Sequence, residues 1–291
     1  MKKVSLKGLL IVVMVLILSL ALPGCKSSDY KEAQGYYSTG NYLQAIQIFT
    51  ELGDYRDSAF MVGQSVEAYE KYVLDIVEKG DFVKALTELD LGKDLLPSYQ
   101  RVKDTIIEAY EEHIFEFMET GDYIKAMKEL DLGKDVLPSY ETLRETIVQE
   151  TLILDGANQV KTHAYSPTSL QVQTVELYKY ATPKDTQLDN YPMMVMKISS
   201  QNRLGGYTSN WVMFYDDKFE YGYFTSTLDK SKADYGESLT ILMIELYRGN
   251  TAIPLCADLA RVNRLLSSGA SLKLDTTIAQ GYYYYDQPQV V

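Results

Sequence analysis

The chain contains one twelve-residue stretch twice: residues 88–99 read ELDLGKDLLPSY and residues 129–140 read ELDLGKDVLPSY. Eleven of the twelve positions are identical, and the difference is Leu95 in one stretch against Val136 in the other. The two stretches lie 41 positions apart, and self-similarity at a period of roughly 20–50 residues is typical of stacked repeats. Because one such unit cannot bury its apolar face alone, we expect the copies to stack.

Three copies of a longer unit can be aligned around this stretch. Residues 67–99 align without a gap to residues 108–140, and a more divergent copy occupies residues 30–58. In each copy a glycine is expected to end a first helix in a left-handed conformation, and the following Asp or Asn to cap a second helix. The shared positions are Gly40-Asn41-Tyr42-Ala45, Gly80-Asp81-Phe82-Ala85 and Gly121-Asp122-Tyr123-Ala126.

This spacing resembles the second half of the tetratricopeptide (TPR) repeat. That part of the motif contains, in order, Gly, Ala, a large apolar residue, a small residue and Pro. The second copy matches it with Gly80, Ala85, Leu89, Gly92 and Pro97. The third copy matches it with Gly121, Ala126, Leu130, Gly133 and Pro138. The period of 41 is longer than the usual one of about 34, and the extra residues are expected to lengthen the first helix, at roughly 98–120. The resemblance implies TPR-like helical repeats over about 30–150, divided as 30–66, 67–107 and 108–150.

The resemblance also implies that the inner face of each first helix binds a partner. That predicted inner face is acidic with an apolar floor and consists of Glu67, Glu70, Leu74 and Glu78 in one copy and Glu108, Glu111, Phe115 and Glu119 in the next. Such a groove suits a basic or amphipathic peptide of a protein partner. Two alternatives stay open: a solvated face that binds nothing, and a groove that holds part of the C-terminal half.

The N-terminus reads as an export signal. Three lysines precede an apolar stretch, GLLIVVMVLILSLAL, of the length of a secretory signal. The following Leu22-Pro23-Gly24-Cys25 resembles a bacterial lipobox, which implies a signal peptide over 1–24, lipidation of Cys25 and a linker over 25–29. We therefore expect a lipid anchor at the outer face of the cell membrane. An ordinary signal peptide or a single anchor helix is the alternative.

Charge divides the mature chain into two parts. Residues 25–150 carry 13 Lys and Arg against 26 Asp and Glu, whereas residues 151–291 carry 12 against 14. The change coincides with a change from helical to alternating patterns, which favours two domains. So acidic a first half argues against nucleic acid as a partner.

The second half is predicted to be an α+β domain over 151–291, with an antiparallel sheet and helices against one face. A helix is expected at 144–165, strands at 170–180, 192–200, 207–215 and 219–226, helices at 238–248 and 255–268, and a returning strand at 272–279. The fold class is thus multidomain, α and α+β. The stretches SPTSLQVQTVEL at 166–177 and MKISSQNRLGGYTSNWVMF at 196–214 loosely resemble β-rich domains of secreted and phage-associated proteins of Gram-positive bacteria, a resemblance that implies no activity.

Motifs that carry chemistry are missing from the sequence. Two histidines and one cysteine besides Cys25 are too few for a usual zinc site, and no nucleophile, phosphate-binding or metalloprotease motif is present. We expect no enzyme, no cofactor and no metal, and His113 is interpreted as a structural residue. The stretch 202–211 offers a candidate ligand loop with Tyr207 and Trp211, and a hairpin whose Trp supports the core is the alternative.

The leading hypothesis is a membrane-anchored extracytoplasmic lipoprotein that acts as a protein–protein interaction scaffold through its TPR-like repeats. The alternative is a binding module for cell-wall glycan or a small ligand, centred on the C-terminal domain. That domain ends in GYYYYDQPQVV at 281–291, in a chain with 25 tyrosines, and tyrosines bind such ligands at low entropic cost.

Overall fold

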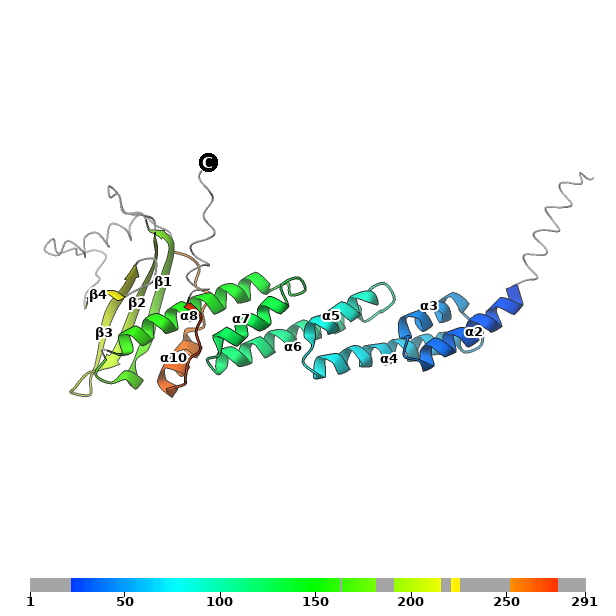
Figure 1. The fold of residues 1–291 in the computed structure, drawn as a ribbon, viewed down its shortest axis with the longest axis horizontal. Coiled ribbons are helices and arrows are strands. Elements are labelled where there is room, and N and C mark those ends of the chain that lie inside the picture. The colour runs from blue at the N-terminus through cyan, green and yellow to red at the C-terminus, as the bar shows by residue number, and fades with distance from the viewer. Residues whose placement is uncertain (1–21, 163, 182–190, 216–220, 226–251, 277–291) are drawn as a thin grey trace, which may run out of the picture. The chain divides into compact units, whose positions relative to one another are not determined.

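The computed structural model describes residues 22–162, 164–181, 191–215, 221–225 and 252–276 (Figure 1). Contacts divide the chain into two compact units, Met1–Tyr110 and Glu111–Val291. The division falls within a helix of the repeat region, so the last copy of the duplicated sequence belongs mostly to the unit that contains the C-terminal sheet. The described part of the chain is mostly helical, with a small antiparallel sheet in its C-terminal half.

The first unit consists of helices. They are α2 (Leu22–Ser38), α3 (Tyr42–Leu52), α4 (Ser58–Glu78), α5 (Phe82–Leu91) and the first half of α6 (Tyr99–Glu119). Each helix turns an apolar stripe inward, so that Phe49, Val73 and Ile106 are fully buried. Phe82 at the start of α5 stacks on Tyr110 of α6, with ring centroids 4.9 Å apart and planes 4° from parallel.

The turns between paired helices follow the sequence prediction. Gly40, Gly80 and Gly121 adopt φ values of 83°, 79° and 79°, a left-handed conformation that only glycine adopts without strain. The carboxylate of Asp81 accepts a hydrogen bond from the Lys84 amide at 3.3 Å, and Asp122 accepts one from the Lys125 amide at 3.2 Å. The predicted caps are therefore confirmed at these two turns, whereas Asn41 makes no capping hydrogen bond from its side chain.

The second copy of the duplicated sequence (67–99) and the third (108–140) form corresponding contacts. The Ser98 hydroxyl donates to Glu70 in one copy, and the Ser139 hydroxyl donates to Glu111 in the other. Tyr99 likewise donates to Asp90, and Tyr140 to Asp131. Ser139 directly precedes the next helix, but its hydroxyl makes no capping hydrogen bond.

The second unit combines helices with the sheet. It contains α7 (Tyr123–Leu132), α8 (Tyr140–Lys161), the short 3-10 helix η1 (Pro167–Ser169) and α10 (Leu259–Ser268). Strands β1 (Gln171–Ala181), β2 (Tyr191–Gln201), β3 (Tyr207–Tyr215) and β4 (Tyr221–Thr225) pair in chain order, each antiparallel to the next. The predicted antiparallel sheet and its four strands are confirmed.

Helix α8 packs on one face of this sheet (Figure 1). A Cβ added at Gly156 would lie 2.8 Å from the Met194 side chain and 3.0 Å from that of Phe214. Glycine is thus what lets the helix approach so closely. Because α8 is covered on several sides, it buries more of its length than the other helices, including Ile147 and Leu154.

Four expectations for the C-terminal part differ from the structure or lie outside it. Residues 272–276 form no strand of the sheet; instead Lys273 makes a parallel bridge to Asp122. Helix α10 begins later than expected, because Asp258 caps it by accepting from the amides of Ala260 at 2.8 Å and Arg261 at 3.2 Å. The expected helix at 238–248 and the tyrosine-rich tail lie outside the described residues.

At the other end of the described chain, α2 begins at Leu22 and includes Cys25, where a linker was expected. None of the described helices is long and apolar enough to cross a membrane.

Candidate functional site

Residues 252–275, named here the docked segment, lie against the third copy and α8 within the second unit. At the centre is a buried ion pair between Arg261 of α10 and Glu150 of α8, whose side chains are 7% and 0% exposed. Arg261 Nε lies 3.0 Å from Glu150 Oε2, and Nη2 lies 2.9 Å from Oε1. Such a bidentate arrangement is the strongest form of this pair.

Two further donors complete the surroundings of the Glu150 carboxylate. The Tyr123 hydroxyl donates to Oε2 at 2.6 Å, and the Asp258 amide donates to Oε1 at 2.8 Å. Burial and the negative charge of Glu150 raise the pKa of Tyr123, so this hydroxyl stays a donor. Burial lowers the pKa of Arg261, but its bonds to Glu150 outweigh that effect and raise it. The cluster is therefore a closed and fully bonded charge pair.

Side-chain amides hold the backbone of the docked segment on both sides of this pair. Buried Gln149 accepts from the Cys256 amide at 2.7 Å and donates to the Pro254 carbonyl at 3.0 Å. Asn263 of α10 accepts from the Val172 amide at 2.8 Å and donates to the Val172 carbonyl at 2.9 Å, as a neighbouring strand would. These contacts fix the segment in register against α8 and β1.

The last part of the docked segment binds the helix–helix turn of the third copy. The Lys273 amide donates to the Gly121 carbonyl at 2.9 Å, and its carbonyl accepts from the Ile124 amide at 3.2 Å. Lys273 Nζ also lies 2.6 Å from Asp122 Oδ2, and this hydrogen bond, more than any other contact, lowers the pKa of Asp122. Leu272 covers Gly121, where an added Cβ would lie 2.8 Å from its Cδ2 atom.

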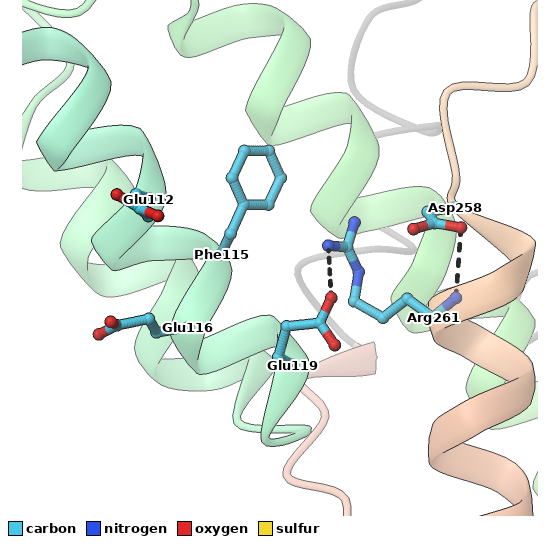
Figure 2. Close-up of a pocket in the computed structure, with 6 residues that line it drawn as sticks. All are labelled: Glu112, Phe115, Glu116, Glu119, Asp258 and Arg261. Carbon is cyan, nitrogen blue, oxygen red and sulfur yellow. Dashed lines mark hydrogen bonds and ion pairs between the residues drawn. The ribbon is translucent and has the colours of Figure 1, made fainter.

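Between α6 and α10 lies an open hollow of about 580 Å³, lined by Glu112, Phe115, Glu116, Glu119, Asp258 and Arg261. Figure 2 shows the guanidinium of Arg261 reaching from α10 toward Glu119 on α6. The distance from Nη1 to Glu119 Oε1 is 3.3 Å, and the guanidinium carbon lies 5.2 Å from the centre of the Phe115 ring. Four of the six lining side chains are carboxylates, so the opening favours cationic groups.

The structure gives the residues of the predicted inner face different surroundings. Phe115 and Glu119 contact the docked segment, and both Glu119 oxygens lie 2.9 Å from Arg264 Nη2. Glu70 and Glu111 accept from serines at the start of the next helix, and Glu70 also pairs with Arg101 at 3.2 Å. The other members, Glu67, Leu74, Glu78 and Glu108, are exposed.

The predicted ligand loop is a tightly bonded hairpin. The Asn202 side chain accepts from the amides of Leu204 at 2.9 Å and Gly206 at 3.1 Å. Tyr207, at the start of β3, is 63% exposed. Trp211 pairs through its backbone with Lys197 and Thr225, and its side chain lies outside the described part of the structure. His113 is partly buried and lies edge-on to Phe117, with ring centroids 4.8 Å apart.

Sequence reasoning missed the pairing of Arg261 with Glu150 and the hydroxyl that supports it. One signal was present: the third copy has Tyr123 where the second copy has Phe82, and the added hydroxyl at a buried aromatic position requires a partner. The partner itself, Glu150, lies beyond the aligned copies. No sequence pattern joins it to Arg261, which follows 111 positions later.

Among the described residues, no group of three or more His, Cys, Asp and Glu side chains could hold a metal ion. Comparison of the chain with models of protein families, with curated proteins and with solved structures found no match.

Proposed function

We propose that this protein is a membrane-anchored extracytoplasmic lipoprotein that acts as a protein–protein interaction scaffold through TPR-like repeats. One observation carries the proposal: the turn of the third copy holds a helix and an extended segment from a distant part of the chain. A repeat surface that binds such a segment within the molecule has the chemistry to bind a similar one from a partner. The anchor rests on the lipobox-like sequence before and including Cys25.

The carboxylates of the site favour binding over catalysis. Glu150 receives four hydrogen bonds, two of them from the guanidinium of Arg261. A carboxylate with its oxygens so occupied has no position left for a substrate proton. Glu119, in turn, faces two arginines. The arrangement therefore supports a surface for basic segments.

The proposal is tested by crosslinking and affinity capture from the native cell envelope, using the full chain as bait. Reversing Glu67 and Glu108 to Lys changes two exposed carboxylates on the predicted inner face, and we expect the captured partner to be lost. The matched control reverses Asp94 and Asp135, which are exposed at equivalent turns elsewhere in the same two copies. Equal capture by both double variants would refute binding through the inner face.

A ligand site on the C-terminal domain is the second candidate, because Tyr207 and Leu204 are exposed on the hydrogen-bonded hairpin between β2 and β3. Retention of the full chain on purified cell-wall glycan, with loss on Tyr207→Ala, would support it. Retention that is unchanged in this variant would exclude the hairpin as the glycan site.

A further inference from the structure

The duplicated sequence allows one docking surface to be compared with its own copy. In the third copy the turn is covered by the docked segment, and Gly121 is buried. In the second copy the equivalent Gly80 has the same backbone conformation, with φ of 79°. It is nonetheless exposed, and no described atom lies within 4 Å of a Cβ placed on it.

The groups of the helix–helix turn that bind the docked segment in the third copy are repeated in the second. Asp81 takes the place of Asp122, which binds Lys273, and Glu78 takes the place of Glu119, which binds Arg264. In the third copy the Gly121 carbonyl and the Ile124 amide form hydrogen bonds with the backbone of Lys273. The equivalent groups of the second copy are the Gly80 carbonyl and the Val83 amide. Leu74, 38% exposed, replaces Phe115 as the apolar floor.

The contacts beyond the turn, those of Glu150, Gln149 and Val172, are not repeated. Of these, the missing carboxylate partner of Arg261 determines which residue the second copy accepts at that position. Phe82 stands in place of Tyr123, and Ala109 in place of Glu150. An arginine in the position of Arg261 would therefore lose its carboxylate partner, and an unpaired buried charge is strongly unfavourable. The second copy thus favours an apolar side chain at that position, which also explains why the protein's own segment binds the third copy.

The first copy provides an internal contrast. Its turn has the same left-handed glycine, Gly40, but Ser38 and Asn41 occupy the positions of Glu78 and Asp81. It has therefore lost both carboxylates that would attract a basic segment. Of the three turns, the second alone combines exposure with the two negative charges.

We propose that the turn surface of the second copy, formed by Leu74, Glu78 and Gly80–Val83, binds a basic segment of another protein. The segment consists of a short helix with Lys or Arg facing Glu78 and an apolar residue in place of Arg261. An extended stretch follows, with an apolar side chain over Gly80 and a Lys paired with Asp81. The inference rests on the proposed scaffold function and locates a binding surface at the turn, which includes the end of the inner face at Leu74 and Glu78.

The test uses a fluorescent peptide with the sequence of residues 259–275 in which Arg261 is replaced by Leu, LALVNRLLSSGASLKLD. It is titrated into the mature chain, and binding is followed by fluorescence anisotropy. We expect saturable binding that Glu78→Lys weakens by about tenfold or more, because an attraction becomes a repulsion. Asp81→Asn should weaken it less, and Ser38→Lys in the first copy should leave it unchanged. The peptide that retains Arg261 should bind more weakly than the Leu version.

Absence of saturable binding, or equal affinity for the wild type and Glu78→Lys, would overturn the proposal. So would binding that is insensitive to Glu78→Lys but lost in Glu119→Lys, because the peptide would then have replaced the docked segment on the third copy. These failures remain distinct from failure of the scaffold function. A partner captured from the envelope through Glu67 and Glu108 would leave that function standing.

Discussion

At the scale of single residues, the buried pair of Arg261 and Glu150 should be far more important for stability than the exposed pair of Arg264 and Glu119. Arg261→Ala leaves Glu150 buried without a countercharge, which costs about 3–5 kcal/mol. Arg264→Ala removes a contact whose arginine is 58% exposed, and such pairs contribute about 1 kcal/mol or less. The free energy of unfolding in denaturant and the rate of hydrogen exchange over residues 252–275 measure the effects of the two substitutions. Equal effects of Arg261→Ala and Arg264→Ala would contradict the described geometry.

The ion pair of Asp122 with Lys273 predicts a pH dependence. The hydrogen bond from Lys273 lowers the pKa of Asp122 below its ordinary value of 3.8, so the pair stabilises the fold above that pH. The stabilisation is lost as the pH falls through the lowered pKa, where Asp122 takes up a proton. Asp122→Asn should therefore destabilise the protein at pH 7 and make progressively less difference below about pH 4.

The matched control for this effect is Asp81→Asn in the second copy. Asn can cap a helix as Asp does, so both substitutions leave the capping bond possible, and the ion pair with Lys273 belongs to Asp122 alone. Thermal unfolding of both variants against pH separates the two contributions. A pH-dependent loss of the same size in Asp81→Asn would show that the cap, not the ion pair, is responsible.

Some residue roles could be predicted from the sequence and others could not. Asp81, Asp122 and the left-handed glycines act locally, within a few positions of the groups they contact, and were predicted. The hydrogen bonds of Glu70 and Glu111 were not predicted, because each accepts from a serine 28 positions away. A contact between residues so far apart in the sequence depends on how the helices pack, and no periodic sequence pattern indicates it.

At the scale of elements, the two equivalent glycines provide a comparison within one molecule. Gly80→Ala and Gly121→Ala both force a left-handed alanine, which costs roughly 1–2 kcal/mol. Gly121→Ala also places a Cβ 2.8 Å from Leu272, so it should cost more and should loosen the docked segment. Hydrogen exchange at residues 270–275 should increase in Gly121→Ala and stay unchanged in Gly80→Ala. An increase in both variants would contradict the contact with Leu272.

The elements themselves were predicted well where the pattern was strong. The four strands lie within a few residues of their predicted bounds, since alternation and turn residues determine them locally. The stretch 272–276 was predicted to return to the sheet, but it pairs with the turn of the third copy. Its alternating sequence fits an extended conformation in either place, and only the docking of α10 decides between them.

At the scale of the whole molecule, membrane attachment is a prediction from the sequence. If Cys25 carries the lipid, Cys25→Ala in the full-length protein should prevent lipidation and shift the protein from the membrane fraction to the soluble exported fraction, or leave it as an unprocessed precursor. Cell fractionation, labelling with a radioactive fatty acid and the mass of the mature N-terminus distinguish these outcomes. If the Cys25→Ala variant were still labelled with the fatty acid and still processed, the predicted lipid anchor at Cys25 would be contradicted.

The scaffold account is tested most directly by photo-crosslinking from single positions in living cells. A photoreactive amino acid replaces Leu74, on the open turn surface of the second copy, and, as the control, Leu91 of the same copy, which is 66% exposed on α5. We predict a defined adduct with another envelope protein from position 74 and none from position 91. No adduct from position 74, or the same adduct from both positions, would contradict binding through the repeat surface.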